Sequence, residues 1–165
     1  KILGYDSSQV IDAKLPFYYN NRIITEDDIK QMENIIHKQN PKHIFVCGDK
    51  DPKGTHWKCA QILQQCSFPE SVDYIWIYYS AWGNWCKDNL QSNCRIYIPK
   101  DLFQLKLLSI DMHISQINPV VRNDKKISSF KDIVLDSNRS EKFPGHFQEK
   151  LCRLSIKKFK EILFK

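Results

Sequence analysis

The sequence predicts an α/β fold with a mainly parallel sheet flanked by helices, and two observations support this prediction. Short runs of β-branched and aromatic residues, which are typical of strands, occur at 43–47, 72–79 and 95–98. Segments whose apolar residues have helical spacing stand around them, at 26–39, 56–66 and 102–117. Strands that alternate with helices in this way are typical of a sheet whose strands run parallel.

The first two predicted helices have clear starting signals. Thr25 stands in the N-cap position, and the acidic residues 26–28 follow it, where the helix dipole favours negative charge. Asn40-Pro41 ends this helix, because a residue before proline is disfavoured in the helical conformation. Thr55 is a candidate N-cap for the second helix, which would leave His56 in its first turn.

The last third of the chain is harder to interpret. Asp101 is a candidate cap for the helix over 102–117. We interpret residues 118–145 as a long loop region, because they are polar and contain two proline turns. Residues 146–164 are predicted to form a closing helix, since their apolar side chains fit one helical face and their lysines the other.

Length and composition are those of an ordinary globular protein. The 165 residues are most simply one domain, with 42% hydrophobic and 27% charged residues. No apolar run approaches the ~20 residues of a membrane helix, and no signal peptide is visible. The chain starts at Lys1 rather than Met, which suggests that an upstream part is absent. The six cysteines form no Cys-x-x-Cys pair, so we expect a reducing, cytoplasmic location and no structural zinc site.

The net charge of +6 raises the question of a polyanionic partner. Most lysines fall into three segments, 38–58, 125–131 and 150–165. A solvated helix face explains the lysines of the last segment better than a phosphate-binding surface does, so nucleic acid is not the expected partner.

The segment Gly48–Trp57 is the strongest candidate for chemistry. It follows a predicted strand and precedes a predicted helix, and open α/β sheets bind ligands at the carboxyl ends of their strands. Two carboxylates, Asp49 and Asp51, stand there beside Lys53 and His56. The alternative is an ordinary Asp-Pro-Lys-Gly turn with no chemical role.

Five segments carry a resemblance to a known family. In order they are Leu15-Pro16-Phe17-Tyr18, Asp51-Pro52-Lys53-Gly54-Thr55-His56, Ser80-Ala81-Trp82-Gly83-Asn84-Trp85, Lys106 followed by His113-Ile114-Ser115-Gln116, and Phe143-Pro144-Gly145. Through these segments the chain resembles the carboxyl-terminal part of the PIG-L/LmbE family of zinc-dependent N-acetylglucosaminyl deacetylases. It is most similar to the deacetylase-like region that some bacterial proteins carry behind a glucosamine-6-phosphate deaminase domain.

The resemblance implies a Rossmann-like fold, truncated at its N-terminus, in which residues 1–165 are the carboxyl-terminal portion of a deacetylase domain. In that family one zinc ion activates water against an acetamide, and its third protein ligand corresponds to His56. The other two ligands and the base come from an amino-terminal Ala-His-Pro-Asp-Asp motif, which these residues lack. We therefore expect the chain by itself to be inactive and to bind zinc weakly.

Other residues of these segments are candidates for the same site. Lys53 replaces a histidine of the family, so its ammonium either hydrogen-bonds the developing oxyanion or marks a degenerate site. Asp49 and Asp51 could orient His56 without contacting the metal themselves, or simply cap a turn. Trp82 and Trp85 follow the second predicted strand and could stack on a sugar ring, or pack together to close the core.

Three functions remain open at this point. The first is a zinc-dependent N-deacetylase acting on an N-acetylated amino sugar or its conjugate. The second is an accessory domain of a glucosamine-6-phosphate deaminase/isomerase, with an upstream deaminase domain as its partner. The third is a basic polyanion-binding module, whose affinity would fall steeply with salt. An upstream Ala-His-Pro-Asp-Asp motif would favour the first over the second.

Overall fold

The computed structural model describes residues 6–48, 55–78, 91–111, 120–122, 126–128, 131, 134–135 and 146–162. The chain divides into two compact units. The first, here called the α/β unit, comprises residues 12–94 and 151–165. The second, here called the α3 unit, comprises residues 1–11 and 95–150. The prediction that residues 1–165 are a portion of one deacetylase domain stays a prediction.

The α/β unit is built on a parallel pair of strands. β1 (His43–Cys47) lies beside β2 (Tyr74–Tyr78), and α2 (Thr55–Gln65) connects them as a crossover helix. The two strands run parallel in register, with His43 opposite Tyr74 and Cys47 opposite Tyr78. The predicted α/β class and the predicted parallel pairing of these two segments are therefore confirmed.

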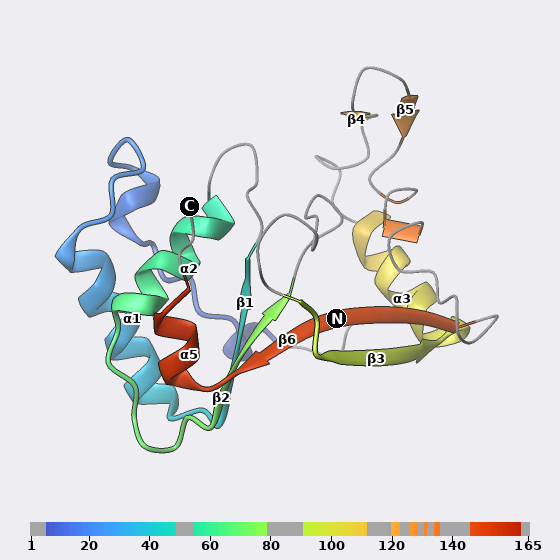
Figure 1. Ribbon diagram of the computed structural model, residues 1–165. Coiled ribbons are helices and arrows are strands. Elements are labelled where there is room, and N and C mark those ends of the chain that lie inside the picture. The colour runs from blue at the N-terminus through green and yellow to red at the C-terminus, as the bar shows by residue number, and fades with distance from the viewer. Residues whose placement is uncertain are drawn as a thin grey trace. The chain divides into compact units, whose positions relative to one another are not determined.

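Helices cover one face of these strands, as Figure 1 shows. They are α1 (Glu26–Gln39), α2 and the short α5 (Ile156–Lys160). Because side chains alternate along a strand, every second residue points toward these helices. The helix-facing residues include Val46, Ile75, Ile77, Cys152 and Leu154, all of which are buried. They form one apolar core with Ile36 of α1, Ala60, Ile62 and Leu63 of α2, and Phe159 of α5. Among the helices that the structure describes, none is long and apolar enough to cross a membrane.

The other face of the same strands carries a ladder of aromatic side chains. Phe45 and Trp76 stand opposite each other and stack with ring centroids 5.5 Å apart and planes 11° from parallel. Arg153 of β6 (His146–Leu154) is opposite Trp76 and places its guanidinium 4.9 Å from the ring centroid of Tyr74. Cross-strand pairs of this kind stabilise the sheet by tenths of a kcal/mol to about 1 kcal/mol each.

A buried carboxylate fixes the segment before α1. Asp28 of α1 has no exposed surface and accepts three hydrogen bonds, all 2.8 Å long. Two come from the backbone N and Oγ1 of Thr25, which confirms the predicted capping of α1. The third comes from the backbone N of Phe17, in the short 3-10 helix η2 (Pro16–Tyr18). Asp28 therefore joins the Leu-Pro-Phe-Tyr segment to α1, with Phe17 buried beneath it.

The predicted closing helix over 146–164 is wrong. Residues 146–154 form β6, whose last four residues pair antiparallel with β2, and only Ile156–Lys160 is helical. Over the last three residues of β6 burial alternates as in a strand, since Cys152 and Leu154 are buried and Arg153 between them is exposed. The free edge of β2 gains hydrogen bonds and buried surface from this strand, which outweighs the weak helical spacing of the segment. The sheet is therefore mixed rather than purely parallel.

Two further predictions need correction. Residues 118–145 are not all loop, because β4 (Val120–Arg122) and β5 (Lys126–Ser128) form an antiparallel pair there. Asp101 does not cap the third helix, because α3 (Lys100–Asp111) begins one residue before it, directly after β3 (Cys94–Pro99). Asp101 instead lies in the first turn of α3.

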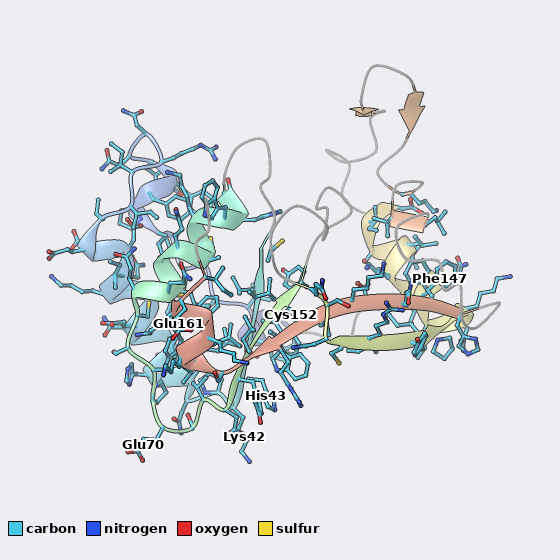
Figure 2. All side chains as sticks on the ribbon, viewed as in Figure 1. Lys42, His43, Glu70, Phe147, Cys152 and Glu161 are labelled. Carbon is cyan, nitrogen blue, oxygen red and sulfur yellow. The ribbon has the colours of Figure 1, made fainter. Side chains whose placement is uncertain are left out.

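The α3 unit has its own contacts. β6 neighbours β3 in the sheet, and α3 contacts the first half of β6 through Phe103, which is fully buried. Phe103 stacks on Phe147, labelled in Figure 2, with centroids 3.8 Å apart. The Lys106 ammonium also donates to the Glu149 carboxylate. Lys106, one of the residues of the resemblance, thus has a structural partner within this unit.

Candidate site around His56

The edge of the sheet where β1 ends is the candidate site. The backbone N of Gly48 donates to the carbonyl O of Tyr78 at 2.9 Å, so the pairing of β1 with β2 continues past Cys47. Residues 49–54 lie outside the described residues, and the chain is described again from Thr55. Thr55 already belongs to α2, so the prediction that it is the N-cap of this helix is wrong. His56 therefore lies in the first turn of a helix that follows a parallel strand, as predicted. This is the edge at which open α/β sheets bind ligands.

The imidazole of His56 has a defined neighbour. Its Nδ1 lies 3.5 Å from the Sγ of Cys47, and either atom could be the donor. The contact joins the last residue of β1 to the first turn of α2 across the loop. A metal-binding histidine commonly has one ring nitrogen held by such a neighbour, while the other faces the metal. For His56 the ring nitrogen that the Cys47 contact does not use is Nε2.

No site role was predicted for Cys47. Its place at the end of an apolar strand suggested only that the thiol packs as a small hydrophobe, and the side chain is indeed buried. The sequence signal for this contact was the position of Cys47. Only a short stretch separates the end of β1 from the start of α2, so residues at these two places can come into contact.

Arg22 is a second residue near His56 for which no role was predicted. Its Nη1 donates to Thr55 Oγ1 at 2.7 Å, and its backbone O accepts from the Lys58 ammonium. Asn21 and Arg22 both have left-handed backbone, with φ of 41° and 61°. The signal in the sequence was the run Asn20-Asn21-Arg22, because asparagine tolerates this conformation better than most residues.

The Leu-Pro-Phe-Tyr segment also approaches α2. Tyr18 Oη lies 4.0 Å from Cys59 Sγ, one turn along the helix from His56. The structure therefore brings the first segment of the resemblance close to the helix that carries His56. The sequence separation of these two segments gave no indication of this contact.

Several predicted site residues fall outside the described residues. They are Asp49, Asp51, Lys53, Trp82 and Trp85. The segments 113–116 and 143–145, which belong to the resemblance but were given no site role, also lie outside the described residues. Their predicted roles stay predictions. Within the ranges that the structure describes, no three His, Cys, Asp or Glu side chains come together in a group that could hold a metal ion.

Two of the other thiols, those of Cys66 and Cys152, are buried. No disulfide joins the cysteines of the described ranges. Cys66 is fully buried in the core, and burial raises the pKa of its thiol from 9.0 to about 12. Burial also raises the pKa of Cys152. Both groups stay protonated at neutral pH, so neither is a candidate nucleophile.

Comparison with known proteins gives an informative match. The chain is 32% identical over 128 residues to a glucosamine-6-phosphate deaminase-like protein of Bacteroides thetaiotaomicron. The match covers 68% of this chain but only 19% of that protein, so the chain spans about a fifth of its relative's length. No family model matches the chain, and no solved structure matches it. The chain is therefore similar to a protein whose name refers to an enzyme that acts on an amino sugar phosphate.

Proposed function

We propose that this chain is the carboxyl-terminal portion of a zinc-dependent N-deacetylase that acts on an N-acetylated amino sugar or its conjugate. The observation that carries the proposal is His56, held by Cys47 at the carboxyl edge of the parallel pair β1 and β2. The ordered segments that resemble the PIG-L/LmbE family support it. So does the relative, whose name refers to the 6-phosphate of glucosamine, the amine that deacetylation of an N-acetylglucosamine derivative would release.

The described residues do not make a zinc site by themselves, since His56 is not joined by two further ligands among them. They are compatible with the contribution of one loop to a zinc site, because the Cys47 contact holds the His56 ring through Nδ1 and the metal would bind at Nε2. The remaining ligands would come from the Ala-His-Pro-Asp-Asp motif of the resembled family. When bound, zinc supplies Lewis-acid chemistry at the amide.

The other predicted residues take supporting roles in this proposal. Lys53 would donate a hydrogen bond to the oxygen on which negative charge develops, and Asp51 would orient His56. Trp82 and Trp85 would stack on the sugar. We also propose a cytoplasmic location, which the cysteine pattern of the sequence predicts.

A second function is favoured by the name of the relative. In it the chain is an accessory domain of a glucosamine-6-phosphate deaminase/isomerase, without chemistry of its own. The two functions differ in their products, since a deacetylase releases acetate from an N-acetylated sugar and a deaminase releases ammonia from the free amino sugar.

The test is a product assay on the native gene product that contains this chain. N-acetylglucosamine, its 6-phosphate and glucosamine 6-phosphate are supplied in separate assays, and acetate and ammonia are measured in each. We expect acetate release that His56→Ala abolishes. His37→Ala is the matched control, because His37 lies on α1, where its Nε2 contacts Ser67 Oγ at 3.3 Å. Ammonia release without acetate, unchanged in His56→Ala, would support the accessory role instead.

A further inference from the structure

The outer edge of β1 has no partner among the strands that the structure describes. β1 stands at the end of the strand order β1-β2-β6-β3. The backbone N of Gly48, just after β1, donates to the carbonyl O of Tyr78 in β2. Backbone groups of successive residues in a strand point to opposite edges, so those of Ile44 also face β2. The N–H and C=O groups of Phe45 therefore face the open edge.

This edge lacks the features that keep an exposed strand from further pairing. Natural proteins protect edge strands with lysine, with proline or with a bulge that twists the strand away. The sequence of His43–Cys47 contains neither lysine nor proline, and its pairing with β2 runs in register without a bulge. β1 is therefore suited to receive another strand on its open side.

A row of side chains across the sheet is incomplete at the same place. Arg153 of β6, Trp76 of β2 and Phe45 of β1 stand opposite one another on the face that the helices do not cover. Phe45 stacks on Trp76 on its inner side, and no described strand supplies a neighbour on its outer side. Its side chain is 56% exposed as a result. A residue on a further strand would pack against the outer side of this ring.

The position of α1 indicates where such a strand would come from. α1 directly precedes β1 and packs on the same face of the sheet as α2, which connects β1 to β2 (Figure 1). Crossovers between parallel strands are right-handed in nearly all proteins, so two crossovers on one face advance through the sheet in the same direction. A parallel strand that leads into β1 through α1 would therefore lie beyond the open edge of β1.

We propose that the open edge of β1 pairs with a parallel strand from the polypeptide that precedes this chain in the native gene product. The chain matches only 19% of its Bacteroides relative, so that protein has further polypeptide able to supply a strand. Parallel strands end at the same edge of a sheet, so the residues after the added strand would lie near His56. The inference goes beyond the proposed deacetylase, because it rests on the pairing and handedness of the sheet and not on zinc chemistry.

The first test is amide hydrogen exchange in the native gene product, measured by mass spectrometry at single-residue resolution. After correction for intrinsic rates, we expect the Phe45 amide to exchange within roughly tenfold of the Ile44 amide, because a further strand would bond the first as β2 bonds the second. The amide of Ile75 in β2 is the control for a strand paired on both sides. A Phe45 amide that exchanges faster than this limit would overturn the inference.

The second test identifies the neighbour by photo-crosslinking. The aromatic crosslinker p-benzoylphenylalanine is placed at position 45 of the native gene product, and circular dichroism reports whether the protein is folded. The matched control has the same group at position 19, where Tyr19 is 81% exposed.

We expect position 45 to crosslink within one polypeptide to a peptide upstream of this chain, and position 19 not to reach that peptide. No crosslink from position 45, or crosslinks only to a second copy or to another region, would overturn the inference. The proposed deacetylase is tested separately by acetate release, which neither exchange nor crosslinking measures.

Discussion

The Sγ of Cys47 lies 3.5 Å from the Nδ1 of His56, so the end of β1 and the start of α2 are in contact through their side chains. If His56 binds zinc, this contact fixes the ring that holds the ion. Cys47→Ala should then lower the zinc affinity of the native gene product by roughly 10–100-fold, the usual effect of losing a group that supports a ligand. Competition with a zinc-chelating dye measures this. Cys59→Ala, on the same helix as His56, is the control, and equal affinities in both variants would contradict the prediction.

Asp28 is expected to be a major contributor to the stability of the α/β unit. Asp28→Ala leaves the backbone N–H groups of Phe17 and Thr25 without their acceptor, and each such loss costs about 1–3 kcal/mol. We expect the free energy of unfolding, measured with urea, to fall by about 3 kcal/mol. Asp27→Ala, at the exposed neighbouring position, should change it by no more than about 0.5 kcal/mol. Similar losses in both variants would show that the Asp28 contacts are not stabilising.

Burial of Cys66 predicts a loss of stability at alkaline pH. The folded-state pKa is raised from 9.0 to about 12, so between these values the unfolded chain loses a proton that the folded chain retains. The stabilisation that the buried Cys66 thiol contributes is fully present below pH 9 and decreases as the pH rises above this value. The urea midpoint of the wild-type chain should therefore fall more between about pH 8 and about pH 10 than that of Cys66→Ala. An equal fall of the urea midpoint in the wild-type chain and in Cys66→Ala would contradict the prediction.

The 165-residue chain alone should bind zinc weakly. A catalytic zinc generally takes three protein ligands, and the described ranges offer no group of three candidate side chains. Calorimetric titration should show no tight, stoichiometric binding. Tight binding that His56→Ala abolishes would reveal ligands among residues that the structure does not describe.

Local signals predicted the first half of the α/β unit well. The Thr25 cap and the acidic first turn defined α1, and the runs 43–47 and 72–79 were apolar enough to be identified as strands, observed at 43–47 and 74–78. His56 was correctly placed in the first turn of α2, because a strand, a turn and a helix succeed one another within a few residues there. These features depend on neighbours in the sequence, which is why the sequence alone was sufficient.

Contacts between distant segments were not predictable in the same way. Strand β6 forms because β2 has an open edge, and nothing in the helical spacing of residues 146–164 indicates that edge. The Arg22–Thr55 bond joins residues 33 positions apart and depends on a left-handed turn. Sequence spacing also gave no sign of the aromatic ladder, whose rungs pair β1 with β2.

The zinc content of the purified native gene product tests the central claim most directly. Elemental analysis should find about one zinc per chain in the wild-type protein and in His37→Ala, as expected for a single catalytic site. It should find little or none in His56→Ala, with unchanged circular dichroism showing that the variant is folded. Equal zinc in His56→Ala and the wild-type protein would contradict the claim that His56 is the ligand this chain contributes.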